Sequence, residues 1–514
     1  MKGDTEYKHG HLPAGWVKAT LREIAHLNPR LLEAEPNEDE LVSFVPMAAV
    51  EAESGRMDPS SRRLWKEVRK GYTRFQEGDV LFAKITPCME NGKFAIAKDL
   101  FNGRAAGSTE FHVIRPKDGV DRKLLLYFLL RTSLRQDARI RMKGAAGQLR
   151  VPPEFLAEIE FPIPPVREQR RIVAEIEKQF TRLDAAVEAL KRVRANLKRY
   201  RASVLKASCE GRLVPTEAEL ARREGRSYEP ASKLLKRIVT ERRAHWEADQ
   251  LTKFRAAGKE PKDDRWKAKY KEPVAPNAVD LTSLPEGWSW ASLEQLSAVF
   301  VDSAHRTPRY GSAGLPALGP RDVVYGVIDL ESARVVDEKE FSIQTARRIP
   351  QAGDVVYSRE LSYGWAALVP ENLRVCLSQG MCLFRPHDSV LVSFLLQVLN
   401  GPPGRDQASK YATGSAHPHI NLSDIKAYHI PLPPLAEQHR IIAESERRLS
   451  VIDELEMQVE ADLKRADRLR QAILKRAFEG KLVPQNPEDE PASILLERIR
   501  AERGKPLSAA VTSR

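Results

Sequence analysis

Apolar residues recur at alternating spacings of four and three along residues 172–204. Nine of the ten positions in this frame are apolar, and they are Ile172, Ile176, Leu183, Ala186, Leu190, Val193, Leu197, Tyr200 and Val204. Such a heptad period is typical of a helix that packs on another helix along a narrow seam. Pro164 and Pro165 precede this stretch, and Gly211 and Pro215 follow it. We therefore predict one long helix over residues 164–211.

The same stretch occurs twice. Residues 161–215 and 430–484 align without a gap at an offset of 269, and 20 of the 55 positions are identical. The identities crowd into the two ends, and only Asp184 and Asp453 match between Glu177 and Arg199. The second heptad frame, from Ile441 to Ile473, is apolar at seven of ten positions. A second long helix is thus predicted over residues 433–480.

Charge favours one way of pairing these two helices. A parallel pair in register would set Glu168 against Glu437. An antiparallel pair about the midpoints brings Glu168 level with Lys475 and Glu175 level with Arg468. We therefore predict an antiparallel coiled coil. The alternative is that each helix packs only on its own domain, which a long strict heptad frame makes less favourable.

Further landmarks repeat in the same order in both halves. Leu-Pro-x-Gly-Trp occurs at residues 12–16 and 284–288, a Gly-Asp turn and strand at 78–82 and 353–357, and an apolar strand ending in Arg-Pro at 111–116 and 381–386. Short strands and helices alternate between them, which is typical of an α/β mixture.

The fold class that we predict is α+β, with two α/β domains separated by a long antiparallel two-helix coiled coil and related by an internal pseudo-twofold repeat. The predicted boundaries are 1–163 for the first globular domain, 164–211 for the central long helix, 212–283 for a basic linker, 284–432 for the second globular domain, 433–480 for the distal long helix and 481–514 for a C-terminal tail.

Composition narrows the class of partner. The chain has 514 residues and a net charge of +12, which favours a polyanionic partner. Half of that excess lies in residues 231–273, with 13 Lys/Arg against 7 Asp/Glu. Such a run is as often a solvated linker as a nucleic-acid contact. Gly258, Pro261, Pro273 and Pro276 indicate that residues 241–272 form an extended or disordered bridge, although it could begin as a helix.

The remaining composition points to a cytoplasmic protein without metal. The four cysteines are scattered without a metal-binding spacing, which suggests a reducing compartment. The sequence has no apolar run of transmembrane length, and residues 1–11 are polar rather than signal-like. We expect no membrane association.

Catalytic signatures are missing. No phosphate-binding loop of the GxxxxGK[S/T] type occurs, and Asn400-Gly401-Pro402-Pro403 only superficially resembles an adenine-methylating motif. His417-Pro418-His419 is more simply an exposed turn than a metal site, because no acidic or cysteine cluster accompanies it. Trp16 and Trp288 are expected to be core anchors. The sequence therefore suits a binding protein better than an enzyme. Its two similar domains with divergent surfaces, in a basic chain, are suited to recognising two different short DNA segments.

Two stretches carry a family resemblance. TGSAHPHINLSDIKAYHIPLPPLAEQHRII (residues 413–442) and, more loosely, GAAGQLRVPPEFLAEIEFPIPPVREQRRIV (residues 144–173) resemble the junction of a target-recognition domain with its following helix in specificity subunits of type I restriction-modification systems. The resemblance extends over essentially the whole chain. In residues 144–150 the first copy departs from the typical pattern, which leaves open whether Gln148 and Arg150 are equivalent to His419 and Asn421.

The resemblance implies a subunit with no catalysis and no cofactor of its own. Each domain would read half of a bipartite double-stranded DNA target with a gap. The paired helices would set that gap and dock two modification (methylase) subunits, which bind S-adenosylmethionine and methylate adenine. Restriction subunits would add ATP- and Mg-dependent translocation and cleavage. Identity at the helix starts suggests that equivalent residues make the methylase contact, namely Glu168, Gln169, Arg171, Glu437, Gln438 and Arg440.

Base-reading residues are sought among basic and amide side chains in loops beside predicted strands. The candidates are Lys84, Asn91, Lys93, Lys143, Gln148 and Arg150 in the first domain, and Arg306, Arg309, Arg359, Lys410, His417 and His419 in the second. Two other readings stay open at this point. One is a structural coiled-coil protein whose ends bind proteins, and the other is a self-contained methyltransferase or nuclease.

Overall fold

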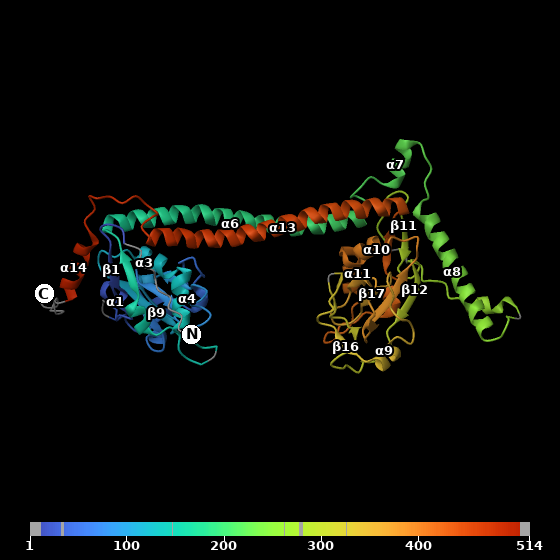
Figure 1. Ribbon diagram of the computed structural model, residues 1–514, viewed down its shortest axis with the longest axis horizontal. Helices are drawn as coiled ribbons and strands as arrows, with labels where there is room; N and C mark the ends of the chain where they lie inside the picture. The colour runs from blue at the N-terminus through green and yellow to red at the C-terminus, as the bar shows by residue number, and fades with distance from the viewer. Residues whose placement is uncertain are drawn as a thin grey trace. The chain divides into compact units, whose positions relative to one another are not determined.

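The chain folds into two compact units, each built from both halves of the sequence. The computed structural model describes residues 12–31, 35–145, 147–261, 263–276, 281–324 and 326–503. Unit 1 comprises Met1–Lys191 with Glu460–Arg514, and unit 2 comprises Arg192–Val459. Each unit therefore combines the globular part of one half with the end of the long helix of the other half, as the colours of Figure 1 show.

The described residues of unit 1 form two four-stranded sheets and one two-stranded sheet. The first has the order β2(Ala25–Leu27)-β9(Phe111–Pro116)-β6(Val80–Ala83)-β7(Phe94–Ile96), with every pair antiparallel. The second has the order β4(Arg62–Leu64)-β3(Leu41–Val45)-β8(Arg104–Gly107)-β5(Thr73–Gln76), in which β3 and β8 are parallel. β1(Val17–Thr20) pairs with β10(Glu160–Ile163). The helices and 3-10 turns are α1(Leu21–Ile24), η1(Met47–Ala49), α2(Trp65–Val68), η2(Phe101–Gly103), α3(Arg122–Leu129), α4(Thr132–Ile140), α5(Pro153–Glu158) and the C-terminal α14(Ala492–Arg503).

The globular part of unit 2 repeats this plan. Its four-stranded sheet has the order β12(Ser297–Asp302)-β20(Met381–Pro386)-β17(Val355–Ser358)-β18(Ala366–Leu368), and its second sheet the order β16(Arg334–Val336)-β13(Leu315–Leu318)-β19(Cys376–Leu377), with β13 and β19 parallel. β11(Ser289–Ser292) pairs with β21(His429–Leu432), and β14(Val323–Val324) with β15(Val327–Ile328). The helices of this part are α9(Glu338–Gln344), α10(Val392–Asn400), α11(Pro402–Tyr411) and α12(Leu422–Lys426). The predicted mixture of helices and sheets is confirmed.

The repeated Gly-Asp turn and Arg-Pro strand end form a buried ion pair in each unit. The Gly-Asp turn starts the central strand, with φ of +88° at Gly78 and +86° at Gly353, a conformation that favours glycine. In unit 1 the Asp79 carboxylate accepts hydrogen bonds from Arg115 Nε (2.7 Å) and Nη2 (2.8 Å). In unit 2 Asp354 accepts from Arg385 Nε at 2.6 Å. The arginine of each Arg-Pro landmark thus neutralises a fully buried aspartate on the neighbouring strand, which would otherwise be costly to bury.

The ends of the long helices meet the Leu-Pro-x-Gly-Trp motifs. A Cβ at Gly480 would lie 2.2 Å from Pro13 Cγ, and one at Gly211 would lie 2.5 Å from Pro285 Cγ. The segments that follow also return to these motifs, because Ala492 N donates to Gly15 O and Ala231 N to Gly287 O, both at 2.8 Å. The helix of each half therefore ends on the motif that starts the globular part of the other half.

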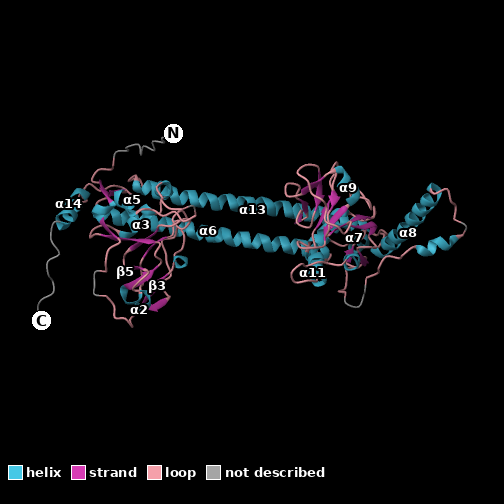
Figure 2. Ribbon diagram, turned by 90° about the horizontal axis from the view of Figure 1, so that it is seen from below, coloured by secondary structure: helices cyan, strands magenta, loops and turns pink. Residues whose placement is uncertain are grey.

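The two long helices are α6(Val166–Cys209) and α13(Leu435–Phe478), each an uninterrupted helix (Figure 2). In unit 1 Asp184 forms an ion pair with Arg470, and the rings of Phe161 and Phe478 lie 6.2 Å apart. In unit 2 Arg201 pairs with Asp453, and Gln397 bridges Ser208 and Ser445. Rising residue numbers on one segment therefore face falling numbers on the other within each unit.

The register that we predicted for these helices is wrong. Glu168 and Glu175 do not face Lys475 and Arg468. The Glu168 carboxylate accepts from the Trp16 indole, and Glu175 bonds to Gln179 and Lys178 on its own helix. Alignment by midpoints failed because the globular parts hold the helix ends.

Burial along the predicted seam is uneven. One heptad column is buried where the helices meet, with Leu197 and Val204 on α6 and Ile452, Val459 and Ala466 on α13. The other column becomes exposed away from the helix starts, with Val193 at 43%, Tyr200 at 47%, Leu455 at 46% and Leu469 at 46% exposure. The pair of helices alone therefore covers only half of its apolar seam.

The predicted linker is largely helical. It contains α7(Glu217–Glu224), α8(Ala231–Ala256) and the 3-10 segment η3(Asp264–Lys269). Residues 241–256 continue α8, in line with the expectation that this segment could begin as a helix. The extended or disordered bridge expected for the rest of it is wrong over residues 264–269, which form η3. Gly258 ends α8 with a φ of +65°, and the aromatic residues on both sides of it hold the chain together, as described below.

Candidate nucleic-acid interface

Three segments of unit 1 meet beyond the end of β6. Arg150 forms isolated β-bridges with both Ile85 and Lys143. Thr86 N donates to Leu149 O at 3.0 Å, and Val151 N donates to Lys84 O at 2.8 Å. The chain after β6 and the loop before α5 are therefore held together, next to the end of α4.

Most of the first-domain candidates lie on this surface. Asn91, Lys143 and Gln148 are exposed, and Lys84 is half-buried. Arg150 is held by Glu110, with Nη2 at 2.8 Å from the carboxylate, and hydrogen bonding to Arg150 lowers the pKa of Glu110. Lys93 differs, since its Nζ donates to Met47 O at 3.1 Å.

Unit 2 builds the same junction with different side chains. The backbone of His419 forms isolated β-bridges with both Glu360 and Thr413, and Ile420 N donates to Arg359 O at 2.9 Å. His419 therefore occupies the place of Arg150, at the repeat offset of 269. Gln148, which we had considered for that equivalence, lies within the loop instead.

The second-domain candidates divide into exposed and paired groups. His417, His419, Lys410 and Arg309 are exposed. Arg359 is buried, and its Nη1 donates to both carboxylate oxygens of Asp302, at 2.7 and 2.8 Å. Arg306 pairs with Glu340 at 3.2 Å. Arg359 thus ties the end of β12 to the junction instead of facing solvent, which removes it from the base-reading candidates.

Ile140 was missed by the sequence analysis. It is the last residue of α4, and 79% of it is exposed, with the exposed Arg139 and Arg141 on either side. The repeat places Lys410 near this position of unit 2, at the end of α11. The sequence signal that could have indicated it is the alternation Arg-Ile-Arg-Met-Lys over residues 139–143.

The residues that we assigned to methylase docking have internal partners. In unit 1 the Trp16 indole donates to Glu168 at 3.1 Å, Gln169 Oε1 accepts from Asp121 N at 2.8 Å, and Arg171 pairs with Asp489 at 2.6 Å. Glu168 and Gln169 are each only 1% exposed. Burial leaves Glu168 and Gln169 no surface to offer a second subunit, whereas the Arg171 side chain stays 36% exposed beside Asp489.

Unit 2 repeats this anchor. The Trp288 indole donates to Glu437 at 2.8 Å, Leu391 N donates to Gln438 Oε1 at 2.9 Å, and Arg440 pairs with Glu217 at 2.6 Å. Glu437 and Gln438 are fully buried, and burial raises the pKa of the Glu168 and Glu437 carboxyls. Trp16 and Trp288 are buried anchors as expected.

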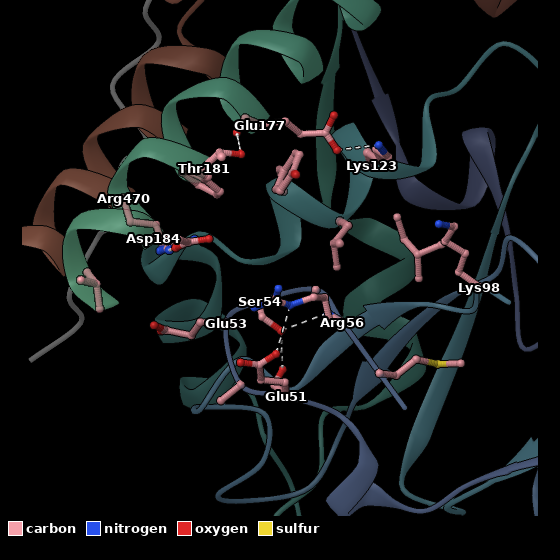
Figure 3. Close-up of a pocket in the computed structure, with 18 of the residues that line it drawn as sticks. Glu51, Glu53, Ser54, Arg56, Lys98, Lys123, Glu177, Thr181, Asp184 and Arg470 are labelled. Atoms are coloured by element: carbon pink, nitrogen blue, oxygen red, sulfur yellow. Dashed lines mark hydrogen bonds and ion pairs between the residues drawn. The ribbon is translucent and has the colours of Figure 1, made fainter. Parts of the chain in front are cut away.

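A groove of about 1310 Å³ lies between the globular part of unit 1 and its helices (Figure 3). Eight Asp/Glu and six Lys/Arg line it. Several of these pair across it or along it, including Lys123 with Glu177 at 2.5 Å and Arg470 with Asp184. This groove has no excess of positive charge that would attract DNA phosphates.

No described helix is both long and apolar enough to cross a membrane. No group of three or more His, Cys, Asp or Glu side chains in the described ranges is placed to hold a metal ion.

Comparison with known proteins identifies the family. The model of the type I restriction modification DNA specificity domain matches residues 13–198 and 324–465. The specificity subunit of the type I restriction enzyme EcoAI from Escherichia coli is 28% identical over 507 residues, covering 88% of this chain and 80% of that protein. The EcoEI specificity subunit, also from Escherichia coli, is 27% identical and covers 90% and 83%. A solved chain from work on assembly and conformational transition of the type I R-M system has a TM-score of 0.59 at 21% identity, covering 92% of this chain and all of that one. The protein therefore belongs to the type I restriction-modification DNA specificity family.

Proposed function

We propose that this chain is the non-catalytic subunit that reads the DNA target of a type I restriction-modification complex. Each globular part would read one half of a bipartite target. The observation that carries this proposal is the shared junction beyond β6 and β17. One backbone construction presents Arg150, Gln148 and Ile140 in unit 1 but His419, His417 and Lys410 in unit 2. A constant scaffold with different exposed side chains suits two different sequences.

The long helices would hold the two readers at a fixed separation. Each has 44 residues, or about 66 Å at 1.5 Å per residue. The equivalent ion pairs Asp184–Arg470 in unit 1 and Asp453–Arg201 in unit 2 support antiparallel pairing of the helix segments within each unit. Such a spacer would set the gap between the half-sites.

The exposed apolar column would dock two modification subunits. Tyr200 and Leu469 are equivalent in the repeat, and 47% and 46% of them are exposed. Helices of a partner could complete the half-covered seam, as in a four-helix bundle. Two equivalent patches suit two copies of one partner. We prefer this surface to the helix starts as the docking site, because Glu168, Gln169, Glu437 and Gln438 are buried there.

The chemistry would reside in the partners. S-adenosylmethionine would be bound by the modification subunits, and ATP and Mg by the restriction subunits, while this chain would bind none of them. The groove in Figure 3, with a small excess of acidic side chains, suits a protein contact better than a nucleic acid.

Adenine-methylation mapping of genomic DNA tests the proposal. Cells with the gene should show one gapped, bipartite methylated motif, and cells without it should lack that motif. The double change His417→Ala and His419→Ala should relax one half of the motif and leave the other half intact. A motif that persists without the gene, or a change in both halves, would contradict the assignment. Salt-independent DNA binding would favour a purely structural coiled-coil protein instead.

A further inference from the structure

Unit 2 carries a helical arm with no described counterpart in unit 1. We call residues 231–271 the basic arm. It begins with the same Pro-Ala-Ser sequence as the C-terminal segment, but α8 has 26 residues whereas α14 has 12. In α8 only Ala231, Leu234 and Ile238 are buried, all near its start. The rest of the arm is not needed to complete the core.

Aromatic contacts fold the arm back on itself. The Trp246 ring lies 5.9 Å from that of Trp266 and 5.3 Å from that of Tyr270, and Phe254 lies 6.0 Å from Trp266. Arg242 Nη1 also lies 3.1 Å from the Tyr270 hydroxyl. The segment after Gly258 is therefore packed along α8, and the aromatic side chains contact one another within the arm.

The outer surface of the arm is polar and cationic. Seven exposed cations of the arm have no ion-pair partner among the described residues. Lys233 and Lys236 lie in the first two turns of α8, and the other five lie farther along the arm, namely Lys253, Arg255, Lys259, Lys269 and Lys271. Two exposed carboxylates of the arm, Asp249 and Glu260, also have no ion-pair partner among the described residues. No large apolar side chain of the described part of the arm is exposed. A stable protein interface usually buries a central apolar or aromatic cluster, which this surface does not offer.

We propose that the basic arm binds the phosphates of duplex DNA outside the base pairs that the unit 2 junction reads. This inference rests on the proposed function, since it requires that the chain binds DNA. Closely set lysines and arginines without apolar neighbours are the chemistry that phosphate backbones attract, with counterion release as the driving force.

The position of the arm places these contacts away from the reading loops. Arg242 Nε donates to Ser297 O at 3.0 Å, and Arg237 Nη1 to Ser389 Oγ at 2.9 Å, so the arm joins the unit beside the first residue of β12. The reading surface begins beyond Asp302, at the other end of that strand, which is about 16 Å away for five steps of ~3.3 Å. The arm therefore contributes affinity without sequence preference.

The test uses the full chain assembled with its modification subunits and two duplexes that contain the mapped target. One duplex ends at the outermost recognised base pairs, and the other continues beyond them on both sides. The five cations farther along the arm are changed together to glutamine. We expect the affinity for the longer duplex to fall by roughly tenfold or more, and the slope of log affinity against log salt to become shallower by about 0.9 per lost phosphate contact. The affinity for the shorter duplex and the methylated motif should not change.

Two further measurements keep the inference falsifiable. The matched control Asp249→Asn with Glu260→Gln removes the exposed negative charges of the arm, and it should raise the affinity for the longer duplex. Circular dichroism should show unchanged helix content in both variants, since all the changed side chains are exposed. Equal losses on both duplexes, or unchanged binding together with lost assembly of restriction subunits, would overturn the inference. A wild-type complex without a gapped target would refute the proposed function itself.

Discussion

Asp184 pairs with Arg470, and the equivalent Asp453 pairs with Arg201. These aspartates are the only identity between Glu177 and Arg199 in the two long helices, and their arginine partners are identical as well. Such a pair occurs once in each unit, always between α6 and α13, and both pairs have the same axial register. The sequence identity in an otherwise divergent stretch thus has a geometric cause.

Reversing one of these charges should destabilise the helix pair in unit 1. Asp184→Arg would set two arginines against each other, and the loss should be about 0.2–1 kcal/mol because Asp184 is half exposed. The double change Asp184→Arg with Arg470→Asp should restore most of it. The urea midpoint of helix loss measures both. If the double variant is no better than the single one, the pair does not set the alignment.

The buried Glu437 should make stability depend on pH. Burial raises the pKa of this carboxyl above its ordinary value of 4.5, although the Trp288 indole opposes the shift. A carboxyl with a raised pKa holds its proton more tightly in the folded state. The free energy of unfolding should therefore fall as the pH rises from 4.5 through the raised value, and should then stay constant.

Glu437→Gln should abolish this part of the pH dependence, because an amide does not titrate. Trp288→Phe should steepen it, because it removes a hydrogen bond that lowers the pKa. Denaturant unfolding at a series of pH values tests both variants. A difference between wild type and Glu437→Gln that stays the same from acid to neutral pH would show that this carboxyl does not titrate differently in the folded state.

Heptad periodicity predicted both long helices, but it could not show which apolar positions meet. Tyr200 and Leu469 fit the frame as well as Leu197 and Ala466 do, yet only the latter are buried. An apolar residue at a heptad position indicates a contact along the helix. It does not show whether that contact is made within the chain or with another protein. The register was missed for a related reason, since the ends of the helices are fixed by contacts such as that of Trp16 with Glu168.

The candidate site was only partly predictable. Loop position and residue type correctly brought Lys143 and Arg150 to one surface. They did not show that Arg359 is neutralised by Asp302, or that Glu168 and Gln169 are buried, because those facts depend on side chains distant in sequence. Identity between repeats does not distinguish an internal anchor from a docking surface.

Ile140 should contact a base in the first half-site. An exposed isoleucine between two arginines can pack on the 5-methyl group of thymine in the major groove. Replacing each thymine of that half-site in turn by deoxyuridine should weaken wild-type binding at one position by about fourfold, from ~0.8 kcal/mol for one methyl-sized group. With Ile140→Ala this position should become insensitive. Ile349→Ala, a change of an exposed isoleucine away from the junction, should retain the wild-type pattern. Sensitivity that survives Ile140→Ala at every thymine would exclude such a contact.

Substitution of an exposed apolar seam residue by glutamate should abolish the binding of one modification subunit for each residue changed. Tyr200 and Leu469 are equivalent but lie in different units, so each would serve one of two docked subunits. Tyr200→Glu or Leu469→Glu alone should give complexes with one modification subunit, and the double variant should give none, because burying an unpaired carboxylate is costly. Mass measurement of the purified complexes counts the subunits. Ile343→Glu, at an exposed apolar position on α9 far from the seam in sequence, should leave two subunits bound. Two subunits on the double variant would mean that the partners dock elsewhere, with the groove of Figure 3 as the next surface to test.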